Sequence, residues 1–226
     1  MKSKITAIKA GKNPRVQRSN VFLEGKFAFS LDNEVIVKEL LKVGRELSAD
    51  YIRELTQADN FRRCLNAAFH FLSFRPRSEA ETRIRLKRRG FEDGDIEKTI
   101  SELKRLELIN DSTFAEFWKE NRDSFRPRSQ RAVKQELRQK GVGRDIIEEV
   151  VSNIDDAENA YRVALTKAGS LPLTDYQLFR QRLGGYLQRR GFNYGVINNA
   201  IKKCWQERTA TGEEPPESSE EVDSAE

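Results

Sequence analysis

Two stretches of the chain share the pattern that determines the fold: RPRSEAETRIRLKRRGF at residues 75–91 and RPRSQRAVKQELRQKGV at residues 126–142. Each begins with RPRS and closes on a glycine followed by an apolar residue, and LQRRGF at residues 187–192 repeats the closing part. The central glycines are 51 and 50 residues apart, at Gly90, Gly141 and Gly191. Self-similarity at a fixed period of this size indicates tandem structural repeats.

Apolar residues recur at fixed distances from each glycine, eight and four residues before it and six and ten residues after it. These positions hold Thr82, Leu86, Ile96 and Ile100 in the first repeat, Val133, Leu137, Ile147 and Val151 in the second, and Leu183, Leu187, Ile197 and Ile201 in the third. Spacings of four residues place one apolar stripe on each of two helices, and the glycine takes the left-handed turn between them. The residue after the glycine is placed for the apolar contact that follows a glycine C-cap.

Capping signals define the first repeat. Ser78 and Glu81 form the S-x-x-E pattern of a capping box, which predicts a helix over residues 79–89. A second helix is expected from Asp93 to residue 106, and a third opens at Asp111 and carries Phe114 inward. We interpret these three helices as one small bundle.

The predicted fold class is mainly α, with three tandem three-helix repeat units in an elongated array where each unit contacts mainly its neighbours. The first 47 residues are expected to form a β-hairpin that turns at Gly25, followed by a helix that Asp32 caps and Gly44 ends. That helix would place Val35, Ile36, Leu40 and Val43 on one face. The predicted boundaries are 1–47 for this segment, 48–124, 125–170 and 171–208 for the three repeats, the last shortened, and 209–226 for a disordered acidic tail.

The charge is distributed unevenly along the chain. The net charge is +5, yet residues 209–226 contain seven acids and no base, which leaves about +12 on residues 1–208. The tail is also rich in proline and serine and poor in large apolar groups, so it cannot offset the entropy of ordering. The basic remainder favours a polyanion or an acidic protein surface as partner.

The inventory of reactive residues argues against an enzyme. The single histidine, His70, lies in the apolar run AAFHFLSF, where a packed residue is far more common than a base or ligand. The cysteines, Cys64 and Cys204, are far apart and form neither a zinc motif nor a disulfide framework, which is typical of the reducing cytosol. No nucleotide, hydrolase or metalloprotease motif occurs, and no apolar run is long enough to span a membrane. We expect no catalytic site, no metal, no cofactor and a cytoplasmic location.

Basic residues cluster at matching places in successive repeats. Arg83 and Lys87, like Lys134 and Arg138, are four residues apart, so each pair projects from one side of its helix, and we expect all four to face solvent. The candidate contact residues are Arg75, Arg77, Arg83, Lys87, Arg88 and Arg89 in the first repeat, Arg126, Arg128, Arg131, Lys134, Arg138 and Lys140 in the second, and Arg189 and Arg190 in the third. Contacts to phosphate should dominate if nucleic acid is bound, because the aromatic residues fall at core spacing.

The combination of RPRSEAETRIRLKRRGF, LINDSTFAEFW, RPRSQRAVKQELRQKGV and LQRRGF closely resembles the RecX regulatory family of bacterial RecA modulators. The resemblance covers roughly residues 50–207, and the segment before it looks like the leader of many members. Thr82 departs from the family pattern, which has an aliphatic residue there, and the third repeat has an extended entry.

The resemblance implies a monomeric, non-enzymatic protein of three three-helix repeats. Such a protein binds the RecA–DNA filament along its groove, touches single-stranded or duplex DNA through phosphates, and inhibits ATP hydrolysis, strand exchange and repressor autocleavage in recombination and the SOS response. Two alternatives stay open: a free-standing DNA-binding regulator of the helix-turn-helix kind, and a protein adaptor with no nucleic-acid role.

Overall fold

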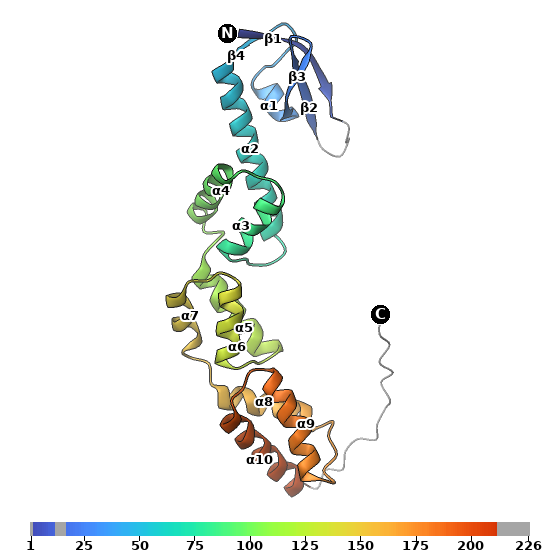
Figure 1. Cartoon of the computed structure of the whole chain (residues 1–226), viewed down its shortest axis with the longest axis vertical. Helices are drawn as coiled ribbons and strands as arrows, with labels where there is room; N and C mark the ends of the chain where they lie inside the picture. The colour runs from blue at the N-terminus through green and yellow to red at the C-terminus, as the bar shows by residue number, and fades with distance from the viewer. Residues whose placement is uncertain (1, 12–16, 212–226) are drawn as a thin grey trace. The chain divides into compact units, whose positions relative to one another are not determined.

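The computed structural model describes residues 2–11 and 17–211, and the chain divides into two compact units at residues 109 and 110 (Figure 1). In the described part of the first unit the elements are β1 (Lys2–Ala10), β2 (Arg18–Leu23), β3 (Lys26–Asp32), α1 (Asn33–Lys38), β4 (Glu46–Ser48), α2 (Ala49–Leu72), α3 (Glu79–Arg88) and α4 (Asp93–Arg105). In the described part of the second unit they are α5 (Asp111–Phe125), α6 (Gln130–Gln139), α7 (Arg144–Val151), α8 (Asp156–Ala168), α9 (Tyr176–Arg189) and α10 (Tyr194–Thr211). The mainly helical fold class predicted from the sequence is confirmed.

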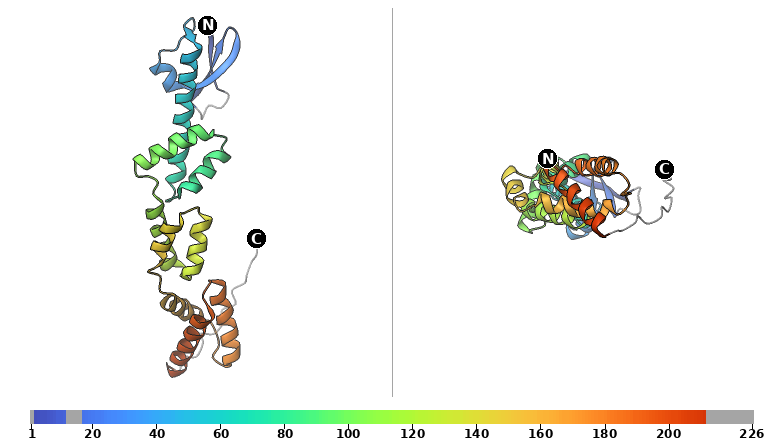
Figure 2. Two further views of the ribbon diagram at one scale, coloured as in Figure 1. Left: turned by 60° about the vertical axis from the view of Figure 1, so that its left-hand side comes forward. Right: turned by 90° about the horizontal axis from the view of Figure 1, so that it is seen from below.

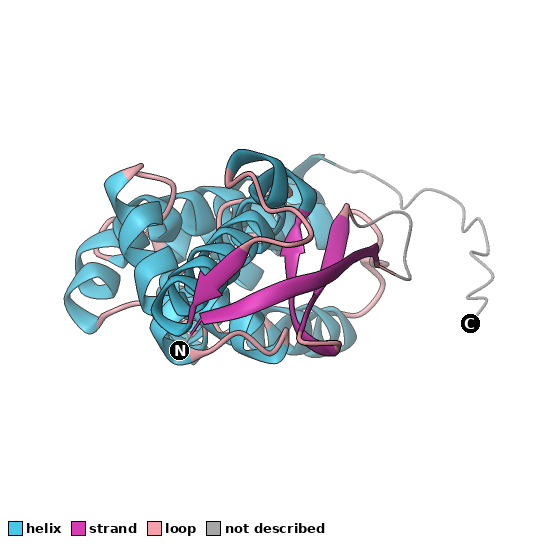
Figure 3. Ribbon diagram, turned by 90° about the horizontal axis from the view of Figure 1, so that it is seen from above, coloured by secondary structure: helices cyan, strands magenta, loops and turns pink. Residues whose placement is uncertain are grey.

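The strands form one antiparallel sheet in the order β3-β2-β1-β4, drawn in magenta in Figure 3. The predicted hairpin is confirmed: Glu24 and Gly25 link β2 to β3 with φ of 47° and 79°, the left-handed pair that a two-residue hairpin turn requires. The sheet also includes β4, which the sequence did not reveal. The side chains that the sheet contributes to the core are Ile5, Val21, Phe29, Leu31 and Leu47.

The helix after the hairpin is shorter than predicted. Asp32 caps it as expected, because its side chain accepts a hydrogen bond from the backbone N–H of Glu34, but α1 ends at Lys38. Leu40 adopts φ of 51°, and its side chain is exposed, as is that of Val43. The predicted apolar face was therefore wrong at these two residues, because the left-handed turn at Leu40 ends the helix before Gly44 is reached.

The helix α2 belongs to two cores. Its first half packs against the sheet through Leu55, and its second half contributes Cys64 and Ala68 to the core that it shares with α3 and α4. Asp59 lies between these halves and is buried, but its carboxylate is paired with Arg18, 2.7 Å away, and accepts the backbone N–H of Asp32 at 3.0 Å. A buried carboxylate needs such partners, and these hold α2 on the sheet.

The glycine repeat has the geometry that its pattern predicted. Gly90, Gly141 and Gly191 have φ of 83°, 77° and 91°, and each follows a helix and precedes the next. All twelve apolar-pattern positions are buried, including the exceptional Thr82. The Thr82 hydroxyl donates to the carbonyl of Ser78 at 3.0 Å, so a polar group is accommodated in the first core without loss of a hydrogen bond.

The grouping of helices differs from the predicted bundle by one helix. The helix α5 packs with α6 and α7, where Phe114 and Ala115 join Val133 and Leu137 in one core. The predicted assignment of α5 to the helices that precede it was therefore wrong. The modules are α2–α4, α5–α7 and α8–α10, and the first helix of each packs on the pair that flanks the repeated glycine.

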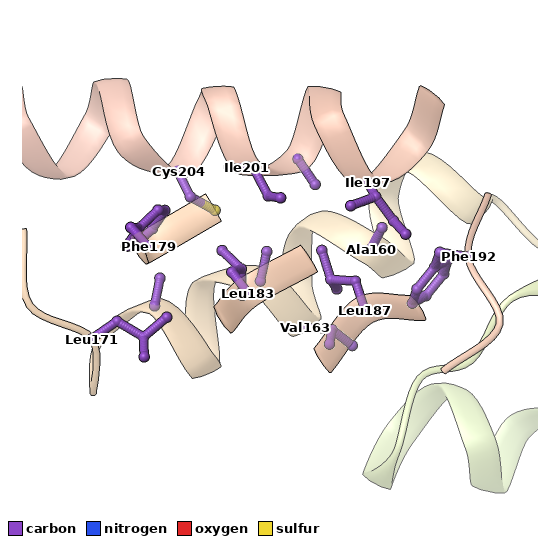
Figure 4. Packing of buried hydrophobic residues seen from close by; sticks show 13 residues of the cluster. Ala160, Val163, Leu171, Phe179, Leu183, Leu187, Phe192, Ile197, Ile201 and Cys204 are labelled. Atoms are coloured by element: carbon purple, nitrogen blue, oxygen red, sulfur yellow. The ribbon is translucent and has the colours of Figure 1, made fainter. Parts of the chain in front are cut away.

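The third module buries Phe179, Leu183 and Leu187 of α9 against Ile197, Ile201 and Cys204 of α10, as Figure 4 shows. The helices α9 and α10 lie side by side in Figures 1 and 2, and α8 completes the bundle. The predicted tail begins too early, because α10 continues to Thr211 and Arg208 is buried, donating to the Leu171 carbonyl at 2.9 Å. The rest of the predicted tail lies outside the described residues.

Candidate basic interface

Three of the four residues expected to face solvent form an ion pair with an acid on the next helix, and two of these three are partly buried. In the first module Arg83 of α3 forms ion pairs with Glu79 on its own helix and with Glu97 on α4, where Nη2 donates to Oε2 at 2.9 Å. In the second module Lys134 of α6 pairs with Glu148 of α7. Both basic side chains are partly buried, so the expectation of free exposure was wrong for them. Lys87 and Arg138 are exposed as expected, but Lys87 also pairs with Asp93 of α4, 3.0 Å away.

These ion pairs occupy equivalent positions, seven residues before and seven after the repeated glycine. Their hydrogen bonds act on both partners. The hydrogen bonds that Arg83 donates to Glu97 raise the pKa of Arg83 and lower the pKa of Glu97, and the hydrogen bond that Lys134 donates lowers the pKa of Glu148. Each pair therefore links two helices, and much of its charge is neutralised inside the module.

The RPRS segments are also built into the structure. Arg75 pairs with Glu81 at 3.0 Å, beside the confirmed capping box of Ser78, and the Arg77 guanidinium lies 4.3 Å from the Phe71 ring centre. Burial, followed by the charge of Arg75, lowers the pKa of Arg77. The arginines of this segment thus hold the loop against α2 and α3, which gives them a structural role.

Glu136 gathers the basic residues of the second module. Its carboxylate pairs with Arg122 at 2.7 Å and with Arg128 at 3.0 Å, and it accepts the indole N–H of Trp118 at 2.7 Å. Lys140 lies over the same indole ring, 4.8 Å from its centre. One carboxylate is therefore shared by two arginines, which leaves this face positive.

The second and third modules meet at the start of α6. The backbone N–H of Ser129 donates to the carbonyl of Arg190 at 3.2 Å, and that of Gln130 donates to the Asp156 carboxylate at 2.6 Å. Burial raises the pKa of Asp156. The third module thus supplies acceptors for backbone N–H groups at the start of α6, which would otherwise lack helical partners.

This junction is the place where the structure brings predicted residues together. A pocket of about 540 Å³ lies over it, with Arg128, Arg131 and Arg189 among its lining residues. A neighbouring pocket of about 350 Å³ is lined by Arg126, Arg128, Tyr186, Arg189 and Arg190. Five of the fourteen predicted residues therefore share one surface.

The remaining predicted residues are distributed over the modules. Arg88 and Arg89 are exposed at the end of α3, while Arg75, Arg77 and Arg83 are engaged within the first module. The prediction missed the amide side chains that line the larger pocket, Gln135, Gln139 and Gln188. Gln135 and Gln139 follow Arg131 at four-residue intervals, so the helical face could have been read from their spacing.

Other kinds of site find no support in the described residues. Within residues 2–11 and 17–211 no cluster of histidine, cysteine or carboxylate side chains could hold a metal, and no helix is long and apolar enough to cross a membrane. Cys64 and Cys204 are buried thiols, and burial raises the pKa of both, that of Cys204 to about 11. A raised pKa is the opposite of what a nucleophilic thiolate needs.

A small antiparallel sheet followed by three similar three-helix modules, with arginines gathered on the joint between two of them, defines a modular helical-repeat protein with a basic face. The chain belongs to the RecX regulatory family. The family model described as the regulatory protein RecX N-terminal domain matches residues 3–48. The models of the first, second and third three-helix domains of RecX match residues 64–103, 110–151 and 154–201.

Relatives and solved structures agree with this assignment. The chain is 31% identical over 206 residues to the regulatory protein RecX of Clostridium beijerinckii, covering 89% of this chain and 95% of that protein. It is 35% identical over 203 residues to the regulatory protein RecX of Bacillus velezensis, covering 88% and 76%.

A crystal structure of a regulatory protein RecX is similar with a TM-score of 0.58 at 25% identity, over 89% of this chain and 99% of that one. RecX from Lactobacillus salivarius gives a TM-score of 0.57 at 25% identity, over 65% and 97%. The family resemblance predicted from the motifs is confirmed.

Proposed function

We propose that this protein is a non-enzymatic, monomeric, cytoplasmic regulator that binds the RecA–DNA filament along its groove and inhibits RecA. The inhibited activities are ATP hydrolysis, strand exchange and repressor autocleavage, in recombination and the SOS response. Membership of the RecX regulatory family is the observation that carries this proposal, because it covers the sheet and all three helical modules.

The arrangement of basic groups supports a polyanionic partner. The arginines at the junction of the second and third modules outnumber the carboxylates that line the same pocket, where Glu136 is the only acid. Contacts on successive modules of one chain reinforce one another, because after the first contact the others form at a high effective concentration. Weak contacts at several modules therefore suffice for binding to a long filament.

The candidate contacts now fall into two groups. Exposed residues that form no ion pair in the described part of the chain, such as Arg88, Arg131, Arg138 and Arg189, are available to a partner. Arg83 and Lys134 lie in ion pairs between helices. A glutamate at either position would face the carboxylate of the former partner, and the repulsion would disturb the fold. Variants that test function must therefore be confined to the exposed group.

The deciding experiment is titration of this protein into RecA that hydrolyses ATP on single-stranded DNA. We expect the hydrolysis rate to fall with added protein. The exposed variant Arg88→Glu/Arg131→Glu/Arg138→Glu should inhibit at least tenfold less well while its circular dichroism spectrum is unchanged. An unaltered hydrolysis rate at saturating protein would contradict the proposal.

Binding at several salt concentrations separates the alternatives. A filament regulator binds RecA filaments more tightly than bare DNA, whereas a free-standing DNA-binding regulator binds both alike with a steep salt dependence. A protein adaptor binds neither bare DNA nor the DNA of the filament, and its affinity for RecA would be the same with and without DNA.

A further inference from the structure

The third module departs from the other two at one pair of positions. Seven residues before and after the central glycine, the first two modules hold the ion pairs Arg83–Glu97 and Lys134–Glu148. The corresponding residues of the third module are Gly184 and Asn198. A glycine and an asparagine cannot form the ionic link, so the surface between α9 and α10 is left open where the other modules are closed.

A pocket of about 410 Å³ lies at this place. Gly184 and the buried Ile197 and Ile201 form its apolar floor, which belongs to the same packing that Figure 4 shows between α9 and α10. A Cβ atom on Gly184 would lie 3.6 Å from the Ile201 Cδ1 atom, an ordinary contact. Close packing of α9 on α10 therefore does not require a glycine here, and the missing side chain of Gly184 keeps the pocket open.

Polar groups surround the apolar floor. The lining includes the exposed amides Gln177, Gln181 and Gln188, the exposed ring of Tyr194, and Arg180, whose guanidinium donates to the Tyr194 hydroxyl at 3.0 Å. No aspartate or glutamate is among the lining residues. The pocket thus offers hydrogen-bond donors and acceptors beside a flat aromatic ring and a positive charge.

This pocket adjoins the arginine-lined pocket at the junction with the second module. Gln188 and Phe192 line both of them. Arg131 and Arg189 are exposed in the second pocket, and within the described residues neither forms an ion pair. The two pockets together make a groove, hereafter the junction groove, with free arginines in one half and amides with a tyrosine in the other.

We propose that the junction groove binds single-stranded nucleic acid, with a phosphodiester at Arg131 and Arg189 and the adjoining unpaired base in the amide-lined half against Tyr194. Arginine suits phosphate because its planar donors match phosphate oxygens. Amide side chains pair with the edges of bases, and exposed aromatic rings stack on their faces. An acidic polypeptide would satisfy the arginines but leave the amides and the ring unused.

The inference deepens the proposed function, since it assigns one of the DNA contacts of the filament regulator. It is tested separately from RecA by fluorescence anisotropy of a short labelled oligothymidine with the full-length protein. The variant Gly184→Lys/Asn198→Glu rebuilds the ion pair of the second module and fills the base half of the groove without a change in net charge. We expect its affinity for the oligonucleotide to fall at least tenfold while its melting temperature does not fall.

The phosphate half has a matched control. Arg131→Gln/Arg189→Gln should weaken binding at least tenfold and lower the slope of log affinity against log salt by roughly 0.7 for each phosphate that the variant no longer neutralises. Lys38→Gln/Lys42→Gln removes the same charge from two exposed residues of the first unit and should change affinity less than twofold. Tyr194→Ala, at a ring that is 70% exposed, tests stacking without a risk to folding.

Several results would overturn the inference. One is wild-type affinity for the oligonucleotide in both Gly184→Lys/Asn198→Glu and Tyr194→Ala. Another is an equal loss of affinity in Arg131→Gln/Arg189→Gln and in the control Lys38→Gln/Lys42→Gln. The third is that the wild-type protein does not bind the oligonucleotide at all. Binding of polyglutamate that responds to the arginine and ion-pair variants as the oligonucleotide does would assign the groove to an acidic polypeptide. RecA inhibition by the same variants is measured in parallel, so loss of oligonucleotide binding with inhibition retained would reject the groove and leave the regulator intact.

Discussion

A Cβ atom on Gly191 would lie 2.6 Å from the Oγ atom of Ser129, so the central turn of the third module packs directly against the N-terminal cap of α6. Ala132 is equally close, with 2.8 Å between its Cβ atom and that position. Gly191 therefore serves two purposes that the sequence repeat cannot distinguish. It adopts the left-handed turn, with φ of 91°, and it leaves room for the neighbouring module.

The first prediction compares two of the repeated glycines. Gly90 has a similar φ, but a Cβ atom there would have no neighbour within 4 Å. Gly90→Ala should cost about 1–2 kcal/mol of unfolding free energy from the left-handed backbone alone. Gly191→Ala should cost about 1–3 kcal/mol more, because the junction must also shift. Urea unfolding followed by circular dichroism measures both, and equal losses would contradict the described junction.

The second prediction concerns Leu137, which is fully buried in the core of the second module. Leu137→Ala should lower the unfolding free energy by about 2–5 kcal/mol, from the reduced burial and the cavity left behind. Leu178→Ala on α9 is the matched control, since that side chain is 36% exposed and should cost less than about 1 kcal/mol. An unchanged melting temperature in Leu137→Ala would show that the repeat register is wrong.

The third prediction follows from the buried thiol of Cys204. Desolvation, followed by the charge of Glu207, raises its pKa from the usual 9.0 to about 11. Between these values the folded protein keeps the proton and the unfolded chain loses it, so stability is full below pH 9 and falls as the pH rises toward 11. The fall attributable to this thiol is at most about 1.4 kcal/mol per pH unit.

The contribution of Cys204 is isolated by the variant Cys204→Ala. The difference in unfolding free energy between the wild type and the variant should be constant below pH 9 and shrink above it. A difference that is independent of pH up to 11 would show that the thiol titrates normally. The native thiol should also react slowly with iodoacetamide at pH 8 and rapidly after unfolding.

The repeated pattern around Gly90, Gly141 and Gly191 was enough to predict the helix pairs, because burial at four-residue spacing and a left-handed turn are both local properties of the sequence. The grouping of α5 was not local. Short linkers precede and follow this helix, and Phe114 reveals an apolar face without showing which neighbour covers it. The end of α1 could not be predicted for a related reason. Leu40 adopts φ of 51°, but leucine is not a residue type that indicates a left-handed turn.

The basic residues of the candidate interface could be predicted, but not the state of their charges. Arg83 and Glu97, like Lys134 and Glu148, are 14 residues apart on different helices, beyond the reach of rules for neighbours within one helix. Comparison of the three repeats does reveal the pairs once the helices are placed, because the partners recur at the same distance from the glycine. The same comparison shows Gly184 and Asn198 as the exception.

The fourth prediction tests the ion pair of the second module. Lys134→Glu places a carboxylate against Glu148 and should lower the melting temperature, whereas Lys134→Glu/Glu148→Lys restores opposite charges and should recover most of the loss. The pKa of Glu148 is lowered by Lys134, so the benefit of the pair is present above the ordinary pKa of glutamate and is lost as the pH falls through the lowered value. If the double variant melts no higher than the single one, the pair does not link the helices.

The last prediction concerns the acidic segment that follows α10. Residues 212–226 contain all seven acids of the predicted tail. The last turns of α10 carry the buried Arg208, which donates to the carbonyls of Ala168 and Leu171. Truncation must therefore follow Thr211, because an earlier cut removes part of the helix that carries this arginine. A polyanion tethered to a basic protein competes with any polyanionic ligand, so truncation should strengthen binding to single-stranded DNA severalfold at low salt. The gain should vanish at high salt, where such charges are screened.

A full-length variant with the seven acids changed to glutamine or asparagine should behave like the truncated protein, which separates the effect of charge from that of chain length. Weaker binding by either variant would show that the acidic segment contributes to the complex and does not compete with it.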